Sequence, residues 1–262
     1  MNISAEKMMI SGADKMMISD DELFRDPPPK EDCSICMLPM PFANELCGVK
    51  TIYMPCCGKT LCKGCVISAE KEMNEGNMKR WCPFCRLILP ERKKEFMKRI
   101  KKRMDVNDAQ AYLQIGLNYY HGLTGLTQDR EKALELFNKA AELGSIEAYF
   151  NIALTTARGE VIGSPEKALH YMSVAAIGGH EVARHNLGLK EETSNGSMER
   201  AMKHYIIAAR CGYDKSLKKV GEGYKAGHVT KDEYANTLRA YQATVNQMKS
   251  KERDNALLVY LN

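Results

Sequence analysis

Cysteine is the residue type in this chain whose number and spacing most clearly predict chemistry. Nine of the ten cysteines lie between residues 33 and 85, and six of them form the Cys-x-x-Cys pairs Cys33/Cys36, Cys62/Cys65 and Cys82/Cys85. Each pair can sit on a tight turn that points both sulfur atoms at one ion, and Zn²⁺ takes four ligands in a tetrahedron. The N-terminus lacks the apolar core of a secretion signal, and clustered cysteines in a reducing compartment bind metal more often than they form disulfides. The pattern therefore predicts a zinc-binding module.

The cysteines of this module are numerous enough for two closed zinc sites. Two sites need eight ligands and the three pairs supply six, so two more come from Cys47, Cys56 and Cys57. No histidine lies between residues 33 and 85, so the ligands must all be cysteine. A closed four-cysteine site leaves no position for water or substrate, so the zinc is expected to be structural. Eight thiolates and two Zn²⁺ would also lower the formal net charge from +5 to about +1, which makes the basic composition weak support for a nucleic-acid partner.

The order of the cysteine pairs, with its ending Cys-Pro-Phe-Cys-Arg at 82–86, resembles a RING finger over about a fifth of the chain. The resemblance implies two zinc ions in a cross-brace. It assigns the first zinc to Cys33, Cys36, Cys62 and Cys65, and the second to Cys56, Cys57, Cys82 and Cys85. The usual RING has a histidine near the position of Lys59, so this chain is more similar to the all-cysteine variant. Cys47 in place of Cys56 or Cys57 is the alternative, because adjacent ligands are sterically tight.

A RING finger carries out no covalent chemistry of its own. The resemblance implies a surface that binds a ubiquitin-conjugating enzyme and holds the ubiquitin thioester in a reactive pose, which is catalysis by positioning. Ile35 and Pro83 match the family's apolar contacts to that enzyme, and Arg86 matches the cation that bridges it to ubiquitin. The alternative is local packing of the zinc loops and a solvated charge. Many active RING fingers carry a tryptophan a few residues after the sixth ligand, where this chain has VISA at 66–69.

From residue 107 onward the sequence repeats. The anchor positions of successive units, 37, 35 and 33 residues apart, are Ala111, Ala148, Ala183 and Ser216. Each unit has a second segment with an Ala-Ala-x-x-Gly ending, and the glycines of these endings are Gly144, Gly179 and Gly212. Apolar residues recur at i, i+3 and i+4 in both segments, which predicts two helices per unit, and the glycines are expected to end helices in the left-handed conformation. Small residues are expected where the paired helices cross: Gly116, Ala153, Gly188 and Gly221.

The Ala-Ala-x-x-Gly ending and the Lys-Ala dipeptides at 132–133 and 167–168 resemble the Sel-one-like repeat more than the tetratricopeptide repeat. The resemblance covers residues 107–212 well and implies an adaptor with a concave surface for protein partners. The expected fold is mostly α: a small RING module of two zinc ions over 31–90, followed over 107–256 by an α-solenoid of about three and a half repeats. The last segment, 213–256, has lost the Ala-Ala-x-x-Gly ending and suits a terminal cap.

Residues 91–106 are basic and are expected to form a linker helix that caps the other end of the solenoid. Phe96, Ile100 and Met104 recur every four residues and make one apolar stripe, so the lysines and arginines cover the solvated face. The alternative is a nuclear-import or phosphate-binding patch.

Residues 1–30 are expected to be a disordered tail. They contain the motif KMMIS twice, at 7–11 and 15–19, followed by acidic residues and three consecutive prolines. A short partner-binding segment is the alternative. No apolar run approaches the roughly 20 residues of a membrane span, so no membrane partner is expected.

Within the repeats, Tyr119, Tyr120, Tyr149 and His121 suit either a peptide groove or core packing, and packing is favoured. Cys211 is expected to be an inert packed thiol. The histidines of the repeats have no cysteine or carboxylate at catalytic spacing, so no catalytic site is expected there.

These features predict a cytoplasmic or nuclear RING-type ubiquitin ligase or adaptor. The zinc module would recruit the conjugating enzyme with its ubiquitin, and the solenoid would hold a protein substrate. Two alternatives remain open: a zinc-containing scaffold that binds partners without promoting transfer, and a chromatin or nucleic-acid reader that uses the zinc module and the basic helix, with Lys101, Lys102 and Arg103 at its centre.

Overall fold

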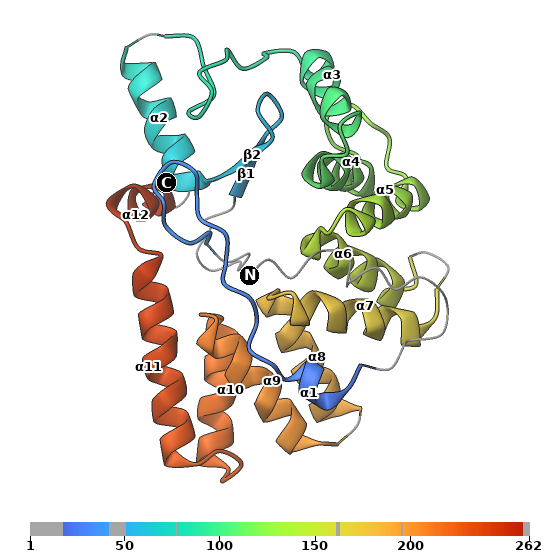
Figure 1. Cartoon of the computed structure of the whole chain (residues 1–262), viewed down its shortest axis with the longest axis vertical. Coiled ribbons are helices and arrows are strands. Elements are labelled where there is room, and N and C mark those ends of the chain that lie inside the picture. Colours follow the sequence, from blue (N-terminus) through green and yellow to red (C-terminus); the bar gives the residue numbers. More distant parts are fainter. Residues whose placement is uncertain (1–17, 42–50, 77, 161–162, 195, 259–262) are drawn as a thin grey trace.

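The computed structural model describes residues 18–41, 51–76, 78–160, 163–194 and 196–258, and most of its elements are helices (Figure 1). The helices are α1 (Asp20–Leu23), α2 (Lys63–Glu75), α3 (Lys93–Met104), α4 (Ala109–His121), α5 (Arg130–Glu142), α6 (Ile146–Ala157), α7 (Pro165–Ile177), α8 (Glu181–Thr193), α9 (Met198–Arg210), α10 (Asp214–Lys225), α11 (Lys231–Gln247) and α12 (Lys251–Leu258). The strands β1 (Thr51–Met54) and β2 (Lys59–Cys62) form an antiparallel hairpin. Among the described residues, no helix has both the length and the apolar composition of a membrane span.

The cysteine module is built on the β1–β2 hairpin and on α2. Thr51 pairs with Cys62 and Met54 pairs with Lys59, which leaves residues 55–58 as the turn. Gly58 ends this turn with a φ of +72°, a conformation that costs glycine little. The core of the module consists mainly of sulfur-bearing side chains: Cys33, Met54, Cys62, Cys65 and Cys82, with Leu61 and Val66. So small an apolar core gives little stability by itself.

The repeats stack as helix pairs, α4 with α5, α6 with α7, and α8 with α9. The Ala-Ala-x-x-Gly ending has a direct backbone role, because Gly144 donates its N–H to Ala141 O (2.9 Å) and Ser145 donates to Ala140 O (2.9 Å). Gly144 has a φ of +90°, and Gly179 and Gly212 repeat this geometry at +97° and +95°. The predicted left-handed helix ends are therefore confirmed.

Glycines at two helix crossings allow a large ring to lie against the partner helix. A Cβ atom at Gly116 would lie 2.6 Å from the ring of Phe137, and one at Gly188 would lie 2.6 Å from the ring of Tyr205. The predicted close approach is confirmed at these two positions. Gly221 differs, because a Cβ there would be 3.7 Å from Tyr234, which is ordinary van der Waals contact.

Helices flank the repeats at both ends, as the sequence predicts. The buried Ile100 of α3, with Phe96 and Met104 beside it, packs against Ala111 and Ile115 of α4. At the other end α10 and α11 follow α9, and α11 begins with a capping box in which Thr230 and Glu233 bond to each other's backbone N–H. The helices describe an arc, and the cysteine module lies between its two ends (Figure 1).

Residues 18–30 differ from the expected disordered tail. They include α1 and pass over the solenoid beside α7, α8 and α9 (Figure 1). The physical reason is Leu23, which is 8% exposed and packs in the apolar cluster of Ala176, Ile177 and Leu187. The first KMMIS motif lies outside the described residues, as does most of the second.

Candidate metal centre

Two of the cysteine pairs lie on loops with the same backbone geometry. In the first loop, Cys33 donates its N–H to Leu38 O (2.9 Å) and accepts from Met37 N–H (2.9 Å). In the second, Cys82 donates to Leu87 O (2.8 Å) and accepts from Arg86 N–H (2.8 Å). The residue after the second cysteine adopts a positive φ in both loops, +54° at Met37 and +60° at Arg86. This shared turn points both sulfur atoms of a pair the same way.

The hairpin and helix α2 position the other two pairs. Cys62 is the last residue of β2 and the N-cap of α2, and Cys65 lies in the first turn of that helix. Cys56 and Cys57 lie in the turn between the strands, where Cys57 and Gly58 both donate to Met54 O. Local secondary structure therefore fixes both pairs.

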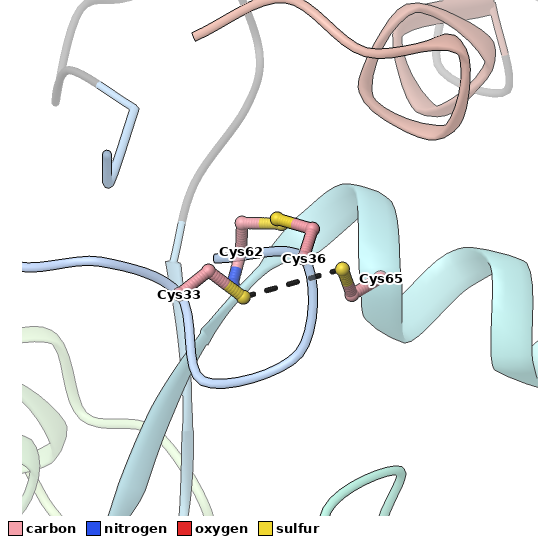
Figure 2. A group of neighbouring side chains, drawn as sticks. All are labelled: Cys33, Cys36, Cys62 and Cys65. Carbon is pink, nitrogen blue, oxygen red and sulfur yellow. Dashed lines mark hydrogen bonds between the residues drawn. The ribbon is translucent and has the colours of Figure 1, made fainter. Parts of the chain in front are cut away.

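The first group brings together four sulfur atoms from the first loop and the start of α2 (Figure 2). The Sγ atoms of Cys33 and Cys65 are 4.0 Å apart, those of Cys36 and Cys62 are 3.8 Å apart, and all four lie within 4.8 Å of one another. Sulfur atoms about 2.3 Å from a tetrahedral Zn²⁺ are separated by about 3.8 Å, whereas a disulfide needs about 2.05 Å. The spacing suits a shared metal ion.

The second group also consists of four cysteine sulfur atoms, and its cysteine pairs alternate with those of the first group along the chain. Cys57 and Cys82 have their Sγ atoms 3.9 Å apart, and those of Cys56 and Cys85 are 3.5 Å apart. These four sulfur atoms also lie within 4.8 Å of one another, so each group could hold a metal ion. The adjacent Cys56 and Cys57 thus both reach the second group, while Cys47 lies outside the described residues.

Burial and backbone donors act in opposite directions on these thiols. Burial raises the pKa of Cys57 to about 11, and it also raises the pKa of Cys65. Burial opposes ionisation of Cys33 too, but backbone N–H groups, with Cys62 first among them, outweigh it and lower the pKa of Cys33 to about 7. Metal ions bind thiolates, so loading the two groups would release protons and would weaken as the pH falls.

Arg253 of α12 contacts the first cysteine group, and the sequence reasoning did not identify it. Its side chain is 3% exposed, and Nη2 donates to Cys36 Sγ (3.3 Å) and to Leu38 O (3.2 Å). Nη1 donates to Pro39 O (2.8 Å) and Met248 O (2.9 Å). A guanidinium here offsets the negative charge of a four-thiolate site and fixes the loop that carries Cys36. Its pairing with a loop 217 residues away leaves no signal in the sequence.

Gly64 makes the approach of α12 possible. A Cβ atom at this first-turn position of α2 would lie 2.8 Å from the Cα atom of Arg253. The glycine is therefore required by the contact between two helices, in addition to the tight turn beside Cys65.

A second tie joins the module to the start of the solenoid. Asp108, the N-cap of α4, accepts hydrogen bonds from Tyr53 Oη (2.7 Å) and Arg103 Nε (2.9 Å). Burial and the Asp108 carboxylate both raise the pKa of Tyr53, so its hydroxyl stays protonated as a donor. The module is thus bonded to both ends of the helical arc.

The three predicted contact residues lie on the two matching loops. Ile35 is 39% exposed, Pro83 is half-buried, and Arg86 is exposed at the position of positive φ. Further large apolar side chains are exposed on the same two loops: Met37, Phe84, Leu87 and Ile88. Both loops therefore expose apolar side chains, and the second loop also exposes the cation of Arg86.

The aromatic residues singled out in the repeats have a packing role. Tyr119, Tyr120 and Tyr149 are half-buried against the cluster around Phe137, whereas His121 is exposed. Cys211 is half-buried, and burial raises the pKa of its thiol, as expected for a packed cysteine.

These observations define a helical repeat protein of the α-solenoid class with a cysteine module bonded to both of its ends. The family model of the Sel1 repeat matches residues 109–145, 146–180 and 183–213, so the chain carries Sel1 repeats. The matched segments contain α4 to α9 and begin after the cysteine module.

The chain is also similar to individual proteins. The chain is 27% identical over 161 residues to chitin synthase regulatory factor 2 of Schizosaccharomyces pombe, covering 56% of this chain and 31% of that protein. A Sel1 repeat protein from Oxalobacter formigenes is similar in structure, with a TM-score of 0.50 and 28% identity over 59% of this chain and 66% of the other. The Escherichia coli antigen c5321 gives a TM-score of 0.44 at 21% identity, over 62% and 39% of the two chains. The chain thus spans about a third of its curated relative.

Proposed function

We propose that this protein is a RING-type ubiquitin ligase or adaptor. The observation that carries the proposal is the pair of interleaved four-cysteine groups, two of whose pairs lie on loops with the same backbone hydrogen-bond pattern. Such a module, loaded with two structural zinc ions, would occupy residues 31–90, with 91–106 as the capping helix and 107–256 as the repeat array. Cysteines kept as thiols are consistent with a reducing compartment, the cytoplasm or the nucleus.

The transfer surface would consist of Ile35, Pro83 and Arg86. Ile35 offers exposed apolar surface to a ubiquitin-conjugating enzyme, with Pro83 on the matching loop as a second contact. The guanidinium of Arg86 can donate to both ubiquitin and the enzyme and so hold the thioester in one pose. The zinc ions would hold these loops and take no part in bond formation.

The Sel1 repeats would hold the protein to be modified. A stack of helix pairs presents a long surface, and proteins with such arrays serve as interaction scaffolds. The matched relative from Schizosaccharomyces pombe is described as a regulatory factor of chitin synthase. A partner-binding role of the repeats is consistent with that description.

A scaffold without ubiquitin transfer is the second candidate. It is favoured by the packing of α12 against α2, the helix that carries Cys65, and by the absence of tryptophan from residues 66–69. The nucleic-acid reader gains less support, because Arg103 of the basic helix is bonded to Asp108.

The test is discharge of ubiquitin from a panel of charged conjugating enzymes onto free lysine. Wild type is compared with Ile35→Ala and Arg86→Ala, after metal analysis has established two zinc ions per chain. Val106→Ala and Arg92→Ala serve as matched controls, since both residues are exposed and lie outside the two cysteine loops. Accelerated discharge that only the first two substitutions abolish supports a ligase. If the protein with both zinc ions bound accelerates discharge from none of the conjugating enzymes, the result supports the scaffold.

A further inference from the structure

Residues 18–30 lie on the solenoid in the manner of a bound peptide. All thirteen are described, and Leu23 is the one buried residue among them, while most of the others are exposed. Leu23 enters the cluster formed by α7 and α8, and the ring of Phe24 lies on His204 of α9 with centroids 4.7 Å apart. The segment therefore has two adjacent apolar anchors, Leu23 and Phe24, while most of its other residues face solvent.

The surface beneath this segment is basic where the segment is acidic. Asp20 pairs with Arg200, and Asp26 pairs with Arg210 at 3.4 Å. The guanidinium of Arg200 also lies 5.0 Å from the centroid of the Phe24 ring. Side chains of one helix, α9, therefore contact three positions of the segment: Asp20, Phe24 and Asp26.

A buried arginine binds the backbone of the segment. Arg184 is 2% exposed, and its Nη1 donates to the carbonyl of Leu23 while Nη2 donates to Ala176 O (2.9 Å). No carboxylate pairs with Arg184 among the residues that the structure describes, and burial lowers its pKa to about 10. A buried cation that donates to the carbonyl of Leu23 satisfies the C-terminal end of α1 and holds it on the solenoid.

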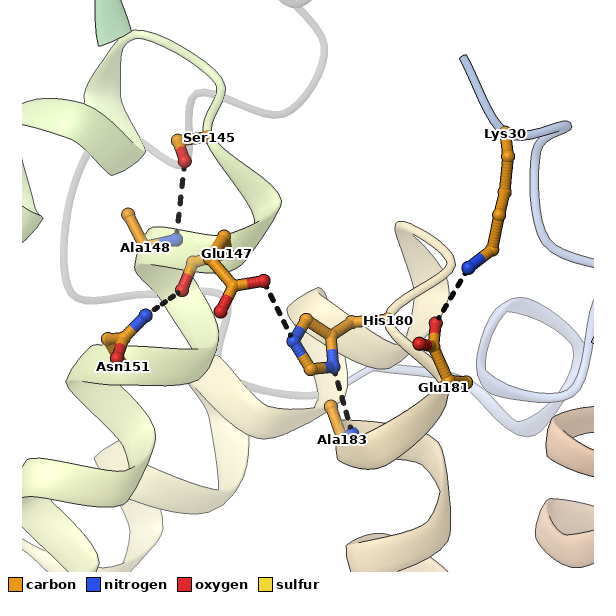
Figure 3. A network of polar contacts seen from close by, with 8 residues as sticks. All are labelled: Lys30, Ser145, Glu147, Ala148, Asn151, His180, Glu181 and Ala183. Carbon is orange, nitrogen blue, oxygen red and sulfur yellow. Dashed lines mark hydrogen bonds and ion pairs between the residues drawn. The ribbon is translucent and has the colours of Figure 1, made fainter. Parts of the chain in front are cut away.

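The segment is also held at its C-terminal end. Lys30 Nζ lies 3.2 Å from Glu181 Oε2, at the start of α8 (Figure 3). Beside it His180 accepts from Ala183 N–H through Nδ1, so Nε2 carries the proton and donates to Glu147 Oε2 (3.2 Å). This bond ties the start of α8 to α6 and keeps the binding surface in place.

We propose that the face formed by α7, α8 and α9 is a binding site for an acidic peptide with adjacent leucine and aromatic anchors, of the type Asp-x-x-Leu-Phe-x-Asp. Residues 19–26 occupy it in cis. The occupant in trans is a segment of the same chemistry in a partner protein. The inference rests on the proposed function only in that the repeats bind proteins, and it does not require ubiquitin transfer.

The strength of the anchorage makes exchange feasible. Burial of one leucine favours the docked state by a factor of roughly 10 to 100, and exposed ion pairs each add only a small factor. A tethered segment has an effective concentration on the order of millimolar, so it outcompetes a weak free peptide of the same sequence. A partner protein that carries the same motif and makes additional contacts with the repeats displaces the tethered segment.

The experiment uses the full chain and a fluorescein-labelled peptide of residues 18–30. The double substitution Leu23→Ser and Phe24→Ser removes both anchors, so the segment should leave the surface. Fluorescence anisotropy should then show that the peptide binds this variant at least 10-fold more tightly than it binds the wild-type chain. A peptide with both anchors replaced by serine should not bind. An emptied chain that fails to bind the peptide, or binds it no better than wild type does, overturns the proposal.

A charge exchange tests the polar half of the site. In the emptied chain, Arg210→Glu should weaken binding of the peptide by about 3- to 10-fold. A peptide with lysine in place of Asp26 should restore the affinity for this variant. Lys225→Glu, an exposed reversal at the end of α10, is the matched control. Equal weakening by both reversals overturns the assignment of the acidic motif.

Hydrogen exchange of the wild-type chain covers the case in which the emptied variant unfolds. Excess unlabelled peptide should then accelerate exchange in residues 18–30 while α7 to α9 stay protected. Unchanged exchange of the segment at saturating peptide overturns the proposal. None of these measurements involves ubiquitin, so their failure is distinguishable from failure of the ligase assignment.

Discussion

The cysteine module and the Sel1 repeats achieve order by different means. The module encloses four cysteines, Cys33, Cys62, Cys65 and Cys82, and few apolar side chains. A repeat encloses alanines around one large ring, as Ala133, Ala140 and Ala148 surround Phe137. The first kind of core consists of side chains that could share a metal ion, whereas the second is completed by helix packing. Metal, acid and added methyl groups should therefore affect the two regions differently.

The largest expected difference is the response to metal removal. Chelation should unfold residues 51–76 and leave residues 109–213 folded, because metal binding supplies on the order of 10 kcal/mol of folding free energy in small zinc modules. Hydrogen exchange with and without a chelator measures both regions in one sample. Cys33→Ser and Cys82→Ser, one in each group, should reproduce the effect, with Cys211→Ser as the control. Full retention of protection in the module after chelation would contradict the comparison.

Acid should weaken the repeats through two buried histidines. Burial lowers the pKa of His185 to about 4 and that of His204 to about 3. Both values lie below that of an unfolded histidine, about 6.5. The unfolded chain therefore binds protons first as the pH falls. The stability that the two neutral histidines contribute is fully present above pH 6.5 and is lost as the pH falls toward their folded-state pKa values, by roughly 3 kcal/mol per histidine at pH 4.

Hydrogen exchange within residues 181–213 between pH 7 and 4, corrected for intrinsic rates, measures this loss without involving the module. His204→Leu should flatten the pH dependence, whereas His121→Leu, at an exposed position, should not. A pH profile unchanged by His204→Leu would exclude that histidine as the cause.

The contact of Arg253 makes the end of the solenoid part of the candidate metal centre. Arg253→Met should weaken metal binding by about 10- to 100-fold, because residues that bond to metal ligands typically contribute that much. Competition with a chromophoric chelator measures the affinity, and Arg239→Met on α11 is the control. Gly64→Ala should act in the same direction by displacing α12. Unchanged affinity in both variants would show that α12 only covers the module.

The smallest expected effect separates two glycines of the repeats. Gly188→Ala should destabilise the chain by about 1 to 3 kcal/mol, because the new methyl group meets the ring of Tyr205. Gly221→Ala has room and should stabilise α10 by about 0.5 to 1 kcal/mol through its helix propensity. Urea unfolding of the two variants measures the difference. Equal effects would mean that the helix crossings do not depend on these contacts.

Local patterns account for the parts of the structure that the sequence predicts. The glycine of Ala-Ala-x-x-Gly adopts its positive φ and bonds to carbonyls within its own turn, so the repeat is visible in the sequence. The Cys-x-x-Cys loops close through bonds of the same short range. The assignment of Gly221 to a close crossing was wrong, because a Cβ atom there would only reach ordinary contact with Tyr234. The position of that ring depends on how α11 packs against α10, which the residues around Gly221 do not encode.

The sequence by itself determined the cysteine pairs, the helix pairs and their endings, since each depends on residues only a few positions apart. Only the tertiary structure placed Arg253 on the loop of Cys36, 217 residues away, and Arg184 on the carbonyl of Leu23, 161 residues away. An arginine in an amphipathic helix has the same local pattern whether it faces solvent or a buried carbonyl. The choice between the two depends on which distant segment packs beside the helix: residues 18–30 beside α8, and the first cysteine loop beside α12.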